Sequence, residues 1–248
     1  MSGHSKWANI KHKKGKADAA RGKIFTKIGR EIAIAVKEGG GDPAVNGKLR
    51  DIIAKAKANN MPNDSITRSI KKAAGEMDNV VFEEITYEGY APGGVAVICE
   101  IVTDNRNRTA SEIRHIFDKN GGSLGTTGSV GYMFDLKGML IVERGPGVDE
   151  DELMMQALEA GAEDVKSYDD SFEILTAPND FSAVREALEE QGIVFVSAER
   201  SKLPQNMVAV DDPEILEKVQ KLLDMLDDND DVMEVYHNAD LPEDEEEE

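Results

Sequence analysis

The first thirty residues carry a dense cluster of cationic side chains. Nine lysines and arginines stand there against a single acidic residue, Asp18. The nine are Lys6, Lys11, Lys13, Lys14, Lys16, Arg21, Lys23, Lys27 and Arg30. A phosphate backbone favours such clustering, because each phosphate that is neutralised releases condensed counterions. The cluster therefore predicts contact with nucleic acid.

An aromatic ring lies inside this basic stretch. Trp7 is the only tryptophan and has no apolar neighbours at helical spacing that would indicate a core position. A base or a sugar can stack on such a ring, as in proteins that bind single strands or RNA. The alternative is that Trp7 anchors the basic stretch onto the folded chain. His12 can contact phosphate or be solvated, and both interpretations stay open.

A second candidate site is the segment DNRNRT at residues 104–109, between a predicted strand and a predicted helix. Asn and Asp suit a turn and cap the helix that follows. Arg106 and Arg108 lie near the positive end of that helix, where an anion is favoured. Two interpretations stay open here, a phosphate site and a capped helix with solvated arginines.

A run of glycines between residues 121 and 131 has the composition of an anion-cradling nest. A nucleotide-binding Walker loop needs Lys followed by Ser or Thr before a helix, whereas Ser129 and Val130 open a predicted strand. Nucleotide hydrolysis is thus disfavoured. A turn-rich loop is the favoured interpretation of the glycines.

The sequence offers little for catalysis. The four histidines lack metal-ligand spacing, and no serine lies in a nucleophile elbow. The single cysteine, Cys99, lies in an apolar run, which excludes an intramolecular disulfide and predicts a buried thiol. We expect no catalytic residue, no metal, no cofactor and no enzymatic activity.

Charge is distributed unevenly along the 248 residues, although the net charge of −20 argues against nucleic acid at first sight. Residues 1–75 hold 17 basic and 6 acidic residues, a net charge of +11, and the remainder has a net charge of −31. Nucleic-acid binding is therefore expected in the amino-terminal third and at the arginine turn.

The apolar runs are too short to span a bilayer, and no signal peptide is evident, which predicts a cytoplasmic protein.

Apolar spacing predicts the elements. Three amphipathic helices are expected over residues 23–39, 44–59 and 62–74, followed by a change to the period of two that is typical of strands. Strands are also expected at 130–134, 194–199 and 232–237, and a further helix is expected at 213–226. Residues 138–203 have the order β-α-β-β-α-β of a ferredoxin-like domain. We predict an α+β multidomain protein with these parts: a basic arm at 1–22, a three-helix bundle at 23–78, an α+β domain at 79–137 plus 204–240, the inserted ferredoxin-like domain at 138–203, and an acidic tail at 241–248.

Several separated motifs resemble those of the YebC/PmpR family. They are GHSKWANIKH at 3–12, RGKIFTK at 21–27, YEGY at 87–90, DNRNRT at 104–109 and GSV at 128–130. The resemblance covers nearly the whole chain and implies a three-domain fold. Members are described as cytoplasmic DNA-binding transcriptional regulators. Others act in translation, among them a mitochondrial activator of cytochrome c oxidase synthesis and bacterial members linked to stalled ribosomes.

We therefore expect a nucleic-acid-binding regulator of gene expression, with transcription as the first hypothesis. The alternative is an RNA- or ribosome-binding translation factor that relieves stalled elongation. A second alternative is an interaction module whose α+β domains bind a partner protein or a small molecule. Expected partners are DNA, ribosomal RNA and the ribosome, with no membrane and with a monomer favoured.

Overall fold

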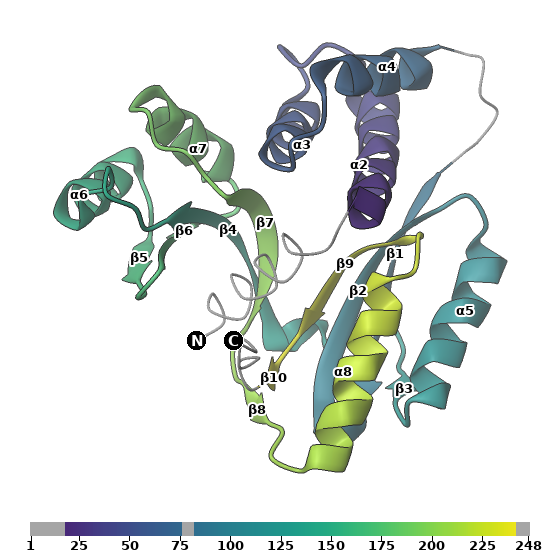
Figure 1. Ribbon diagram of the computed structural model, residues 1–248. Coiled ribbons are helices and arrows are strands. Elements are labelled where there is room, and N and C mark those ends of the chain that lie inside the picture. Colours follow the sequence, from purple (N-terminus) through teal and green to yellow (C-terminus); the bar gives the residue numbers. More distant parts are fainter. Residues whose placement is uncertain (1–17, 76–81, 242–248) are drawn as a thin grey trace. The chain divides into compact units, whose positions relative to one another are not determined.

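The computed structural model describes residues 18–75 and 82–241, with side chains from residue 22 onward (Figure 1). These residues form an α+β fold with seven α-helices and two four-stranded sheets. Among these helices, none combines the length and the apolar character that crossing a membrane requires. The described chain forms two compact units: unit 1 contains residues 35–75 and 136–203, and unit 2 contains residues 18–34, 82–135 and 204–241.

Three helices follow one another in the basic third of the chain, as the apolar spacing predicts. They are α2 (Asp18–Gly39), α3 (Gly47–Ala58) and α4 (Asn63–Ala74). The predicted start of the first helix, at Lys23, is wrong, because α2 begins at Asp18. Ala19 and Ala20 are strong helix formers and extend the helix over residues that were predicted to belong to an irregular arm.

Asn46 links the end of α2 to the start of α3. Its side-chain oxygen accepts a hydrogen bond from the amide of Leu49 at 3.0 Å, which caps α3. Its side-chain nitrogen donates to the carbonyl oxygens of Ala35 and Gly40, both at 2.8 Å. Asn46 is buried, so each of these polar groups needs its partner.

The sheet of unit 1 has the strand order β5-β6-β4-β7. In chain order its elements are β4 (Phe134–Glu143), α6 (Glu150–Ala160), β5 (Asp164–Ser167), β6 (Ser171–Thr176), α7 (Phe181–Glu190) and β7 (Ser197–Pro204). Strand β6 pairs antiparallel with both β4 and β5. Both helices lie on one face of this sheet, where Leu140, Leu153, Phe172 and Leu188 form a buried core (Figure 1).

The sheet of unit 2 has the order β3-β1-β2-β9, with antiparallel pairing throughout. Its elements are β1 (Glu83–Ala91), β2 (Val95–Thr103), α5 (Arg106–Lys119), β3 (Ser123–Leu124), α8 (Pro213–Asp227) and β9 (Val232–His237). Helices α5 and α8 cover one face, with Phe117 and Leu222 packed on Cys99 (Figure 1). The prediction that Cys99 is buried is confirmed, and burial raises the pKa of its thiol.

Short elements complete unit 2. They are the 3-10 turns η1 (Pro92–Gly94) and η2 (Gly131–Met133), and the paired strands β8 (Val208–Ala209) and β10 (Ala239–Asp240). On the face of the sheet opposite α5 and α8, Ile34 of α2 packs with Val102 and Met233. The first part of α2 therefore belongs to the core of unit 2.

Two predicted strands differ from the structure. Residues 130–134 were expected to form a strand, but η2 occupies most of this range and β4 begins only at Phe134. The amides of Val130 and Gly131 donate to the side chain of Glu88. These amides are therefore not available for hydrogen bonds to a neighbouring strand. The strand predicted from Val194 begins at Ser197, and Val194 itself is 80% exposed.

Candidate nucleic-acid interface

The structure describes five side chains of the thirteen residues predicted to contact nucleic acid. Seven of the thirteen lie outside the described residues: Lys6, Trp7, Lys11, His12, Lys13, Lys14 and Lys16. Arg21 lies in α2, but its side chain is outside the described part. The five described are Lys23, Lys27, Arg30, Arg106 and Arg108, all in unit 2.

Three of these cations lie on one side of α2 and contact the end of α8 and the turn that follows it. Lys23 donates to the carboxylate of Asp228 at 3.1 Å and to its carbonyl oxygen at 3.2 Å. Lys27 donates to the carbonyl oxygen of Asp227 at 2.8 Å. The carboxyl end of a helix carries partial negative charge, so cations are favoured there. These lysines therefore stabilise the attachment of α2 to unit 2.

Asp231 is the buried centre of an ionic cluster in unit 2. Its Oδ1 accepts a hydrogen bond from Arg30 at 2.7 Å, and its Oδ2 accepts one from Arg108, also at 2.7 Å. The same Oδ2 accepts from the hydroxyls of Thr109 at 2.6 Å and Thr103 at 3.1 Å. The Asp231 side chain is only 5% exposed. One carboxylate thus joins α2, the end of β2, the start of α5 and the residue before β9.

These contacts set the ionisation of Asp231. Burial by itself raises the pKa of a carboxyl group, because it disfavours the charged form. Hydrogen bonds from Thr109, Arg108 and Arg30 outweigh burial and lower the pKa of Asp231 to about 2. Asp231 is therefore a carboxylate at neutral pH and presents a fixed negative charge to both arginines.

The arginine turn is a helix cap. Asn105 accepts a hydrogen bond from the amide of Arg108 at 3.1 Å, which confirms the predicted capping of α5. Arg108 also pairs with Asp104 at 3.0 Å, and its contacts with Asp231 and Asp104 raise its pKa. Arg106 is exposed on the first turn of α5. A phosphate site at this turn stays a prediction, and Arg106 is its more accessible cation.

The glycine-rich loop does form a nest of backbone amides, but a carboxylate of unit 2 itself fills the nest. The side chain of Glu88 accepts hydrogen bonds from the amides of Gly128 and Val130 at 2.8 Å and of Gly131 at 2.7 Å. Glu88 is only 7% exposed. These three amides are therefore directed at Glu88 rather than at an external anion, which agrees with the favoured interpretation of a turn-rich loop.

A third carboxylate, Asp51 of unit 1, connects α3 to α7 and β7, and its side chain is 12% exposed. Asp51 lies 3.2 Å from Arg185 and 2.9 Å from Arg200, and the Ser182 hydroxyl donates to it at 2.9 Å. The Arg185 side chain is only 3% exposed. Two cations of α3 also pair within unit 1, since Arg50 lies 3.4 Å from Glu186 and Lys55 lies 4.0 Å from Glu199. Arg50 and Lys55 of α3 therefore have acidic partners within unit 1.

Sequence reasoning missed Glu88, Asp51 and Asp231 as organising residues. Glu88 lies within the YEGY motif at 87–90, but that motif gives no sign of its hydrogen-bond partners, and no motif includes Asp51 or Asp231. The available signal is indirect. Lys23, Lys27 and Arg30 recur at helical spacing on α2, and cations that pack against a fold need an acidic side chain or a carbonyl oxygen as partner.

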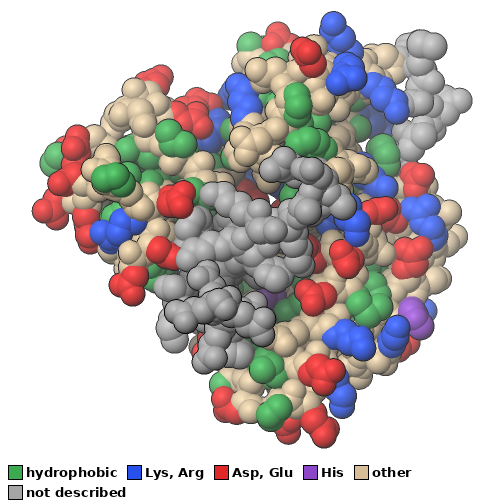
Figure 2. Space-filling view, viewed as in Figure 1, with side chains coloured by type: hydrophobic (Ala, Val, Ile, Leu, Met, Phe, Trp, Pro, Cys, Tyr) green, Lys and Arg blue, Asp and Glu red, His purple; other side chains and the backbone are tan. Residues whose placement is uncertain are grey.

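Exposed cations in unit 1 gather on α4. Arg68 contacts only its own helix among the hydrogen bonds described, through the carbonyl oxygen of Asp64 and the hydroxyl of Ser65. Arg68, Lys71 and Lys72 are all exposed. Figure 2 shows Lys and Arg side chains gathered over this helix. Helix α4 therefore presents three exposed cations on unit 1.

Comparison with known proteins identifies the family. Residues 5–76 match the family model described as "TACO1/YebC protein N-terminal domain", and residues 82–239 match the one described as "TACO1/YebC second and third domain". The chain belongs to the TACO1/YebC family, which confirms the resemblance seen in its motifs.

Close relatives extend over the whole chain. A protein from Acetivibrio thermocellus named "Probable transcriptional regulatory protein" is 64% identical over 238 residues, covering 96% of this chain and 98% of the relative. A protein of the same name from Ruminiclostridium cellulolyticum is 60% identical and covers both chains completely. The crystal structure of a conserved hypothetical protein from Aquifex aeolicus has a TM-score of 0.84 and 46% identity, covering 94% of this chain and 96% of that one.

Proposed function

We propose that this protein is a regulator of gene expression that binds nucleic acid through its amino-terminal third. The observation that carries the proposal is the charge separation, with a net charge of +11 over residues 1–75 and −31 over the rest. Phosphate favours the first part, and the acidic remainder repels it, which confines binding to one region. The names of the relatives, which refer to transcriptional regulation, support DNA as the first target.

The contacts are proposed to come first from the basic segment before α2. Lys23, Lys27, Arg30 and Arg108 have acidic side chains or carbonyl oxygens as partners, and a phosphate would have to displace these. The lysines at positions 6 to 16 carry the main electrostatic contact in this proposal, with Trp7 stacking on a base or sugar. Arg106 and the exposed cations of α4 supply further phosphate contacts.

RNA is the alternative target. The helix α4 offers Arg68, Lys71 and Lys72, which suit phosphate contacts better than the reading of base edges in a major groove. Binding by charge and shape with aromatic stacking is typical of RNA recognition. This favours a translation factor that contacts ribosomal RNA. DNA and RNA are thus the two alternative targets of the proposed nucleic-acid-binding regulator.

The remaining parts of the chain are proposed to orient the basic region and to recruit partners. We propose that residues 138–203 are a ferredoxin-like domain inserted into an α+β domain made of 79–137 and 204–240. The order of elements from β4 to β7 and the strand order β5-β6-β4-β7 support this. The proposal includes a monomer that acts in the cytoplasm without catalysis.

Crosslinking in living cells tests the proposal. Nucleic acid bound to the full chain is sequenced and compared with that bound to a chain that lacks residues 1–17, a deletion chosen to leave α2 complete. We expect the deletion to abolish crosslinking. Discrete promoter sites would establish transcription, whereas one locus in ribosomal RNA would establish the translational alternative. Equal crosslinking by both chains would contradict the proposal.

A further inference from the structure

Helix α6 of unit 1 exposes two large apolar side chains on the face that points away from its sheet. The helix is anchored to the sheet through Leu153 and Ala157, which are both buried. Met155 and Leu158 are 56% and 53% exposed. Residues three positions apart are neighbours on a helix surface, so these two side chains form one patch. Packing α6 on its sheet leaves this patch open.

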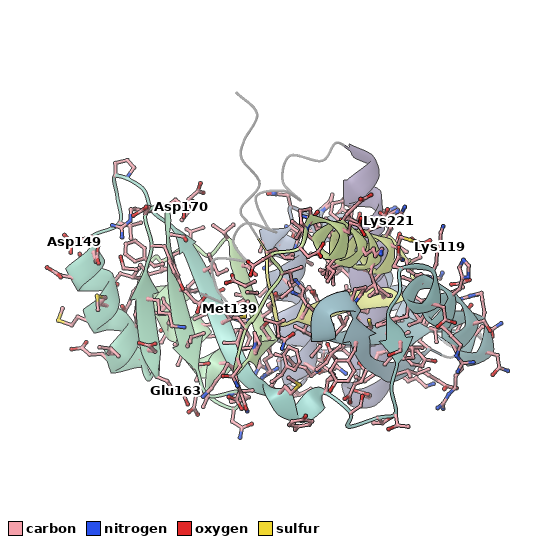
Figure 3. The ribbon with its side chains drawn as sticks, turned by 90° about the horizontal axis from the view of Figure 1, so that it is seen from below. Lys119, Met139, Asp149, Glu163, Asp170 and Lys221 are labelled. Atoms are coloured by element: carbon pink, nitrogen blue, oxygen red, sulfur yellow. The ribbon has the colours of Figure 1, made fainter. Side chains whose placement is uncertain are left out.

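Carboxylates surround the patch. Asp151, Glu152 and Glu159 are exposed on the same helix. Figure 3 shows Asp149 at the start of α6 and Glu163 beyond its end, and both are acidic as well. Figure 2 shows hydrophobic side chains among acidic ones over this helix. The outward surface of α6 is therefore apolar at its centre and negative around it.

Neither helix on this sheet exposes a lysine or arginine of its own, and the neighbouring cations Arg144 and Lys137 are paired with Glu150 and Glu163. Helix α6 contains no lysine or arginine, and the only one in α7 is Arg185, whose side chain is 3% exposed. A surface that serves only solubility usually mixes both signs of charge. A predominantly negative surface next to exposed apolar side chains is instead what a complementary partner recognises.

We propose that the outward face of α6 is a docking surface for a lysine- or arginine-rich amphipathic segment of a partner protein. Aliphatic side chains of that segment cover Met155 and Leu158, and its cations pair with the surrounding carboxylates. The unbranched thioether of Met155 adapts to different apolar partners. Nucleic acid is the wrong occupant, because the carboxylates repel phosphate. The surface includes none of the residues proposed to contact nucleic acid, so either proposal can fail alone.

The test titrates the isotope-labelled full chain with a short synthetic helical peptide that has one leucine face and one lysine face. Two matched peptides replace lysine by glutamate or leucine by serine. We expect amide signals of residues 150–160 to shift with the leucine–lysine peptide only, and the affinity to fall as salt is raised. Shifts confined to other elements, or equal binding of the serine–lysine peptide, would overturn the proposal.

Paired substitutions separate apolar contact from charge. Met155→Glu with Leu158→Glu makes the surface more acidic, yet we expect binding about tenfold weaker because the apolar anchor is lost. The matched control is Val45→Glu, at a residue of unit 1 that is 79% exposed, which should leave the affinity within about twofold. Asp151→Asn with Glu159→Gln should weaken binding and reduce its salt dependence. Unchanged binding in the Met155 and Leu158 variant would contradict the proposal, and melting temperatures verify that each variant folds.

Two other occupants are tested in the absence of peptide. If the basic segment of the same chain covered α6, deletion of residues 1–17 would shift the amide signals of α6. If a second copy covered it, dilution of the protein would shift them. Either result would overturn the proposal of a foreign partner, and signals that stay unchanged in both experiments would support it.

Discussion

The carboxylate of Asp231 lies 2.7 Å from the guanidinium of Arg30, although 201 positions separate the two residues. The same carboxylate lies 2.7 Å from Arg108. Arg30 and Arg108, which the sequence predicts to contact phosphate, therefore both pair with the carboxylate of Asp231. The contact couples the basic third of the chain to the acidic part and makes Arg30 a structural residue first.

Asp231→Asn should lower the free energy of unfolding by about 1.5–3 kcal/mol, because charge-assisted hydrogen bonds to two arginines are weakened. Urea denaturation of both proteins measures the difference. Asp228→Asn is the matched control, since Asp228 forms an exposed pair with Lys23 and should contribute less than about 1 kcal/mol. Equal losses in the two variants would show that the Asp231 cluster does not stabilise the fold.

Stability should depend on pH in two separate windows. Burial lowers the pKa of His237 to about 4 from an ordinary value of 6.5, so the unfolded chain binds a proton more readily there. Stability should then fall as the pH drops from 6.5 to 4. Asp231, with its pKa lowered from 3.8 to about 2, adds a further loss as the pH falls from 3.8 towards 2.

Two measurements check these windows. The imidazole signal of His237 should titrate near pH 4 in the folded protein, and denaturation curves at several pH values should give the slopes. Asp231→Asn should reduce the loss below pH 3.8 and leave the window of His237 unchanged. A histidine signal that titrates at 6.5 would contradict the burial argument.

Glu88→Gln should loosen the glycine-rich loop. The substitution removes the charge that three amides share, at a cost of about 1.5–3 kcal/mol. Hydrogen exchange at Gly128, Val130 and Gly131 should become faster. The control is Glu83→Gln on the same strand, where the side chain is exposed. Unchanged exchange in the Glu88 variant would mean that the carboxylate does not hold the loop.

The affinity for nucleic acid should fall steeply with salt. If about six cations neutralise phosphates, the logarithm of affinity should change against the logarithm of salt with a slope of roughly −4 to −5. Lys13→Gln with Lys14→Gln should make this slope shallower by roughly 1.5–2 and leave the melting temperature unchanged. Arg30→Gln should lower the melting temperature and leave the slope unchanged. The reverse pattern would place the phosphate contact on α2 instead.

Trp7→Ala separates the two interpretations of this aromatic ring. If a base stacks on the ring, affinity for single-stranded RNA should fall by about 1–3 kcal/mol with no change in melting temperature. Filter binding and thermal denaturation give the two values. An unchanged affinity with a lower melting temperature would show that Trp7 anchors the basic segment to the fold.

Local patterns in the sequence predict most of the elements. The strand at 232–237 has the predicted bounds, and α8 begins at the predicted residue, Pro213. Both carry strong local signals, since apolar residues recur at the proper period and Asp212 caps the helix. The charge separation and the family motifs are likewise readable without a structure, because they depend only on which residues occur and in what order.

The tertiary structure decided which charges are available for binding. The side chains of Lys23 and Arg30 look free in the sequence, yet the fold brings the end of α8 and Asp231 against them. The glycine-rich loop looks open to an external anion. In the fold, the side chain of Glu88, at least forty positions earlier in the sequence, accepts the hydrogen bonds of its amides. Periodicity and spacing report contacts within a few residues. Pairing over long separations depends on the packing of distant elements, and this is why these carboxylate partners emerged only from the fold.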